Sequence, residues 1–191
     1  MLQTLRCLAF ILLASAALGA CGTDEALSEE QPFVCESSVR IEFLPDAPAP
    51  GQESYVCFGF DAALLEGKTI SGIRWFPPAG GGVSLHHATL FATAEDVVEG
   101  PSPCDAMPAD AVGLHVFAPG GTPLRLEPGV GLELPSGTRR LLVEAHALRT
   151  ATSAPEPTSA EICTLAEPPA RLAALLGVTA PVPAIRPRHE E

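Results

Sequence analysis

The chain has 191 residues, of which 23 are acidic and 11 basic, so its formal net charge is −12. A chain of this charge is repelled by phosphate backbones, which excludes nucleic acid as an expected partner. The 20 prolines and 17 glycines favour short strands over long helices. The length is sufficient for one domain with a core of its own.

The first 20 residues have the features of an export signal. Arg6 precedes an apolar run from Cys7 to Leu18, which is shorter than the roughly 20 residues of a membrane-spanning helix. The run ends in Leu18-Gly19-Ala20-Cys21. This resembles a bacterial lipobox, which implies that Cys21 is lipidated and becomes the mature N-terminus. The alternative is an ordinary signal peptide with small residues before its cleavage site.

We therefore expect residues 1–20 to be a lipoprotein signal peptide and residues 21–32 to be the lipidated cysteine and a flexible acidic tether. Residues 33–186 are expected to form the folded domain, and residues 187–191 a disordered tail. The expected location is the bacterial cell envelope, with the membrane as a partner through the lipid. We favour the outer membrane over the inner one because Gly22 is not acidic.

Strand-like segments recur between proline- and glycine-rich turns along the domain. They are Val39–Phe43, Tyr55–Phe60, Lys68–Phe76, Val83–Thr93, Gly113–Ala118, Val130–Leu134, Arg139–Leu148 and Ser159–Leu165. Only Pro169–Leu176, which Gly177 follows, has a helical pattern. This spacing predicts an all-β protein, an antiparallel β-sandwich or jelly roll, with at most one short helix near the C-terminus.

Four cysteines lie beyond the signal and the lipidated residue: Cys35, Cys57, Cys104 and Cys163. An even number in an exported chain predicts two disulfides. Their spacing allows three pairings and does not choose among them. No Cys-x-x-Cys spacing occurs among them, so a zinc ribbon is not expected.

Three of the histidines lie on two of the longer predicted strands: His86 and His87 on one, His146 on the other. Neighbours in a strand face opposite sides, so the pair can share an ion only if the backbone bends or the rings use different nitrogens. Taken singly, each is most simply a core or surface histidine. Together they form a His₃ set suited to copper, the highest in the divalent affinity order, with zinc as second choice. Glu144, two residues before His146, either orients that ring or is an ordinary solvated carboxylate.

The order of these motifs resembles the copper type II ascorbate-dependent monooxygenases, the family of peptidylglycine alpha-hydroxylating and dopamine beta-monooxygenases. The resemblance covers roughly residues 33–186 and is confined to the N-terminal of the family's two jelly-roll halves. The matching segments are Tyr55-Val56-Cys57-Phe58, His86-His87-Ala88-Thr89-Leu90-Phe91, residues 114–134 with the sequence LHVFAPGGTPLRLEPGVGLEL, Val143-Glu144-Ala145-His146-Ala147, and Cys163 with Glu167-Pro168-Pro169.

The resemblance implies one copper ion on His86, His87 and His146. It also implies disulfides between Cys57 and Cys104 and between Cys35 and Cys163. The sequence departs from the family beside the ligands, where Ala88, Ala147 and Glu144 replace the usual Met, Tyr and Gln. His115 stands where Tyr is frequent, near the strand of the expected site, and is a weaker candidate for supporting it.

The family's second half binds the oxygen-activating copper through a His-x-His pair and a Met. No His-x-His occurs in this chain, and Met107 is the only Met after the signal. We therefore expect a copper-binding, electron-transferring module that is not active as an enzyme alone. The expected partner is an electron donor or a protein that carries the missing half. One alternative function is a subunit of a split copper hydroxylase. Another is a non-catalytic structural or interaction domain with a degenerate metal site. A zinc hydrolase is a smaller possibility, with Glu144 as its base.

Overall fold

The computed structural model describes residues 33–46, 48–77, 83–150 and 154–175. The predictions of a signal peptide, a lipidated Cys21, a tether and a C-terminal tail at residues 187–191 therefore concern residues outside those described. The elements below belong to one compact unit that begins at Val34. Among the described residues, no helix has the length and apolar character that a membrane crossing requires.

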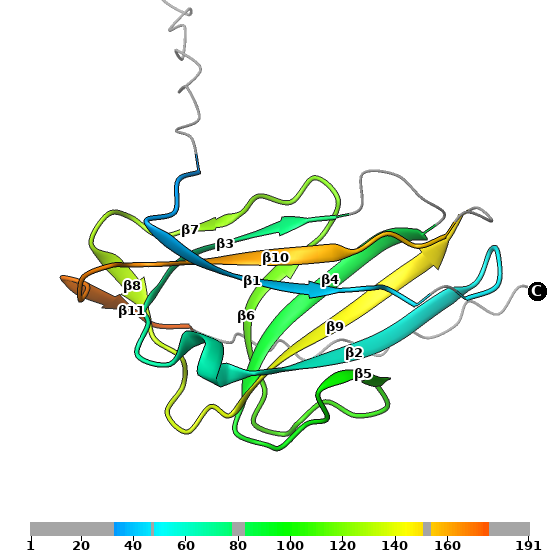
Figure 1. Ribbon diagram of the computed structural model, residues 1–191, viewed down its shortest axis with the longest axis horizontal. Helices are drawn as coiled ribbons and strands as arrows, with labels where there is room; N and C mark the ends of the chain where they lie inside the picture. Colours follow the sequence, from blue (N-terminus) through cyan, green and yellow to red (C-terminus); the bar gives the residue numbers. More distant parts are fainter. Residues whose placement is uncertain (1–32, 47, 78–82, 151–153, 176–191) are drawn as a thin grey trace, which may run out of the picture. The chain divides into compact units, whose positions relative to one another are not determined.

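Two β-sheets make up this unit (Figure 1). The first has the order β1-β10-β3-β8-β11, with β7 also paired to β3. Its strands are β1 (Ser37–Phe43), β3 (Ile70–Phe76), β7 (Leu124–Arg125), β8 (Val130–Leu132), β10 (Thr158–Thr164) and β11 (Arg171–Ala173). The second has the order β5-β2-β9-β4-β6. Its strands are β2 (Glu53–Asp61), β4 (Val83–Thr93), β5 (Gly100–Pro103), β6 (Val112–Phe117) and β9 (Arg140–Arg149).

The core lies between the two sheets, as the alternation of apolar residues predicts. Ile73 and Ile162 of the first sheet and Leu90 and Val143 of the second belong to one cluster and are fully buried. Burying each such side chain stabilises the fold by about 1.5–3 kcal/mol. The prediction of an all-β sandwich is confirmed.

The predicted helix over Pro169–Leu176 is wrong. Arg171–Ala173 forms strand β11, which pairs in parallel with β8, and the Arg171 N–H donates to the Gly129 carbonyl at 3.1 Å. An eight-residue helix is too short to be stable without packing, so an available strand edge prevails over the helix propensity of Ala and Leu. The helical segment that the described residues do contain is a short 3₁₀ turn, Ala62–Leu65, capped by the Asp61 side chain.

Each of two disulfides links a cysteine next to an edge strand with a cysteine in the neighbouring strand of the same sheet. Cys35, just before β1, is bonded to Cys163 in β10, and Cys57 in β2 is bonded to Cys104 after β5. These are the two pairs that the family resemblance implies. They span 128 and 47 residues, and closing such loops restricts the unfolded chain enough to stabilise the fold by about 5 and 4 kcal/mol.

Candidate metal centre

The candidate site lies on the outer face of the second sheet, where β4 and β9 pair. His87 in β4 is directly opposite His146 in β9. The next pair along, Ala88 and Ala145, is buried in the core. Because side chains alternate along a strand, His87 and His146 point away from the core on the same face.

A β-bulge at His86 brings the third histidine to this face. Leu85 pairs with Ala147 and His87 with His146, so His86 is an extra residue between two consecutive pairs. A bulge interrupts the alternation and re-aims a side chain. The backbone therefore bends at the point where two neighbouring histidines need it in order to share an ion.

The three imidazoles converge through their Nδ1 atoms. The Nδ1 of His87 lies 3.4 Å from that of His86 and 3.3 Å from that of His146. A tetrahedral ion with bonds of about 2.0–2.1 Å holds its ligand nitrogens about 3.3–3.4 Å apart. One nitrogen from each of the three rings lies within 4.8 Å of the others. The structure thus contains a three-histidine group that could hold one metal ion.

Solvent reaches this group from one side. His146 is only 6% exposed, His87 is half-buried and His86 is exposed. Three protein ligands with an open side leave room for water or another small ligand, the arrangement that distinguishes reactive metal sites from closed structural ones.

Glu53 orients His146 and was not predicted from the sequence. One carboxylate oxygen of Glu53 lies 3.0 Å from the Nε2 of His146. With the proton on Nε2 donated to this carboxylate, the lone pair is on Nδ1, the atom that faces the other histidines. Starting the predicted strand at Glu53 instead of Tyr55 would have placed Glu53 and Tyr55 on one face, because they are two residues apart.

Tyr55 is the second neighbour that was missed. It lies opposite His146 in the β2–β9 register. Its ring stacks on the imidazole with centroids 4.0 Å apart and planes 9° apart. The stacking covers one face of His146 and restricts its rotation, so Glu53 and Tyr55 together fix the ring that is most buried.

Glu144 lies on the same face, opposite Thr89 of β4. Burial lowers the pKa of His87 below its usual 6.5, and the neighbouring His146 and His86 add to this, whereas the charge of Glu144 raises the pKa. The net effect keeps His87 neutral at pH 7, the form that binds a metal. Glu144 therefore acts on the site through its charge.

His115 supports the sandwich instead of the site. It pairs with the core residue Leu90, so its side chain points between the sheets. There its Nδ1 accepts the indole N–H of Trp75 at 2.9 Å. Burial lowers the pKa of His115. The expectation that His115 lies beside the three ligands is wrong, because the register of β6 turns it to the opposite face.

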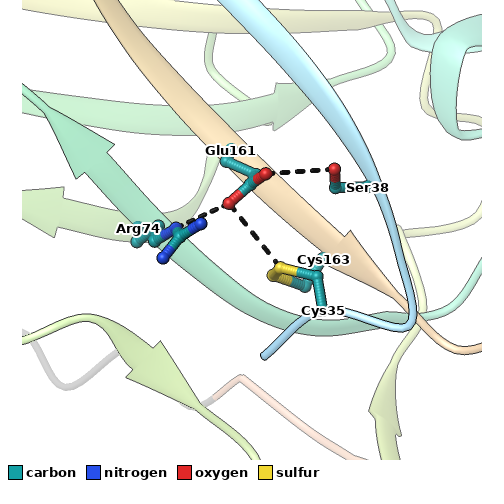
Figure 2. Close-up of a disulfide and its surroundings, with 5 residues drawn as sticks. All are labelled: Cys35, Ser38, Arg74, Glu161 and Cys163. Carbon is teal, nitrogen blue, oxygen red and sulfur yellow. Dashed lines mark hydrogen bonds and ion pairs between the residues drawn. A yellow bond between two sulfur atoms is a disulfide. The ribbon is translucent and has the colours of Figure 1, made fainter. Parts of the chain in front are cut away.

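Cys35, Glu161 and Cys163 form a second group with metal-like spacing, but its donors are already used (Figure 2). The cysteines are joined in a disulfide. The Glu161 carboxylate accepts from Arg74 at 2.6 Å and from Ser38 at 3.1 Å. Without thiolates and with its carboxylate paired, this group is a structural link between β1, β3 and β10.

Comparisons of this chain with models of known protein families and with curated proteins find no match. What the chain does is therefore argued from the geometry of the three histidines and from the motifs quoted above.

Proposed function

We propose that this chain binds one copper ion through His86, His87 and His146 and exchanges single electrons through it. The observation that carries the proposal is the gathering of three imidazoles: the Nδ1 atoms of His86 and His146 lie 3.4 and 3.3 Å from that of His87, and one nitrogen of each ring lies within 4.8 Å of the others. Neutral imidazoles are good ligands for both Cu(I) and Cu(II), so one electron can be gained or lost with the same three protein ligands.

Copper is preferred over zinc for two reasons. An all-imidazole site binds copper more tightly than other divalent metals of the first transition row. The quoted motifs also resemble the electron-storing half of the copper monooxygenases. Zinc is the competing occupant, because the tetrahedral spacing of the nitrogens suits it equally well.

The proposed setting is the cell envelope, with the protein anchored through a lipid on Cys21. Two disulfides are compatible with an oxidising compartment outside the cytoplasm. An electron donor, or a protein carrying an oxygen-activating copper, would complete the redox chain.

The test is a titration of the purified chain with Cu(II) and with Cu(I) against chromophoric chelators. We expect one equivalent of copper to bind, and His146→Ala to weaken binding by more than about 100-fold, because even loss of a residue that orients a ligand costs 10- to 100-fold. His115→Gln is the matched control, since it changes a half-buried histidine outside the group and retains an acceptor for Trp75. Equal binding by His146→Ala and His115→Gln would refute the site.

Competition between copper and zinc for the same purified protein identifies the preferred metal. Copper should displace zinc from the loaded protein at equal concentrations, and the copper should cycle reversibly between its two oxidation states. Displacement in the opposite direction would make the chain a zinc protein, with no role in electron transfer.

A further inference from the structure

A cavity of about 610 Å³ lies beside the metal centre, where the end of β1 approaches β2 and β5. Its walls come from four short segments of the described chain. They are Leu44, Pro45 and Asp46 after β1, Tyr55, Val56 and Phe58 in β2, Pro101, Ser102 and Pro103 in β5, and Pro155.

The lining is that of a small-molecule site. Eight of the ten residues are apolar or aromatic, and only Asp46 and Ser102 are polar. Four are prolines, which offer no backbone N–H to a ligand. Pockets of about 300–1,000 Å³ with mostly apolar walls and few polar groups are typical of sites for small organic molecules.

The rim leaves apolar surface uncovered. Leu44 and Tyr55 are 52% and 51% exposed, which places both with the exposed large apolar or aromatic side chains of the described residues. Both border the cavity. Exposed apolar surface gathered around a hollow marks a binding site more often than a single exposed side chain does.

Charge restricts what can bind. Among the described residues that line the cavity there is no lysine, arginine or histidine, and the charged one, Asp46, is an anion. An anionic ligand would lose its hydration without gaining a partner. We propose that this cavity binds a small, uncharged aromatic molecule, whose flat faces suit apolar walls rich in proline.

Tyr55 connects this cavity to the metal centre. It borders the cavity and stacks on His146 with ring centroids 4.0 Å apart. The cavity and the metal centre thus share Tyr55, the residue whose ring stacks on a ligand imidazole. Binding in the cavity does not depend on the proposed copper, whereas communication between the two does rest on that proposed function.

The first experiment uses two fluorescent probes, uncharged N-phenylnaphthylamine and its anionic relative anilinonaphthalene sulfonate. We expect the metal-free chain to bind the uncharged probe at one site, and the anionic probe at least about 10-fold more weakly. Leu44→Glu should weaken binding of the uncharged probe by a similar factor. Leu172→Glu is the matched control, because Leu172 is 59% exposed and lies in β11, at the opposite edge of the sheet from β1.

Equal binding of the uncharged probe by the two variants would overturn the assignment of the site. Equal binding of both probes by the parent would overturn the argument from charge. Both substitutions are at exposed positions, and unchanged melting temperatures would show that the variants are folded.

Adding Cu(II) separates the cavity from the proposed function. It should quench the bound probe in the parent but not in His146→Ala. Probe binding without copper binding would leave the cavity intact and refute the copper site. Copper binding without probe binding would refute the proposed cavity site and leave the copper site intact.

Discussion

Replacing Glu53 with alanine tests how the protein prepares His146 for a metal. The carboxylate is the group that holds a proton on Nε2, at 3.0 Å. Without it, the neutral ring can carry its proton on Nδ1, the atom that must bind the ion. Residues that hold a ligand histidine in this way are typically worth 10- to 100-fold in metal affinity, or about 1.4–2.8 kcal/mol.

Glu53 itself is 58% exposed at its side chain, so its loss should change the free energy of unfolding by less than about 0.5 kcal/mol. Glu53→Ala should therefore weaken copper binding 10- to 100-fold while the melting temperature of the metal-free chain stays the same. Glu53→Gln retains an acceptor without the charge, so its copper affinity should lie between those of the parent and the alanine variant. The control is Glu42→Ala, an exposed glutamate of β1 in the other sheet.

Copper affinity is measured by competition with a chelator, and stability by thermal unfolding. Equal affinities for Glu53→Ala and Glu42→Ala would refute the reasoning. So would a fall in stability that accounts for the whole loss of affinity.

Three further predictions concern protons and disulfides. The pKa of His115 is lowered by burial, so below pH 6.5 the unfolded state takes up the proton first and the metal-free fold loses stability as the pH falls. Fluorescence of Trp75, the only tryptophan, should report this loss, and His115→Gln should reduce it. The pKa of His87 is lowered from its usual 6.5, so protons should compete with a metal for this residue only below pH 6.5. Equilibrium dialysis at pH 6.5 and 7.5 should therefore give similar stoichiometry, and loss of the metal at pH 6.5 would contradict this. Replacing Cys57 and Cys104 together with serine should lower the free energy of unfolding by about 4 kcal/mol, measured by urea denaturation. A loss below about 1 kcal/mol would show that the unfolded chain is not restricted as the loop length implies.

Most of the sandwich could be predicted because its strands alternate between turn residues. Val83–Thr93 was predicted with the observed bounds of β4, and the His₃ set was predicted from residue type. The helix over Pro169–Leu176 failed because local propensity says nothing of an unpaired strand edge at β8.

The arrangement of the site could not be predicted from the residues alone. Strict alternation places His86 and His87 on opposite faces, and only the register of β4 against β9 reveals the bulge that unites them. Register likewise decides that Glu53 and Tyr55 meet His146 and that His115 faces the core. Pairing between strands depends on the whole fold, which one strand's sequence does not contain.

The most direct test of the copper site is X-ray absorption spectroscopy of the chain loaded with one equivalent of Cu(I). The account predicts three imidazole nitrogens at about 2.0 Å in the parent and loss of one of them in His146→Ala. A spectrum dominated by sulfur or oxygen ligands, or one that His146→Ala leaves unchanged, would contradict it.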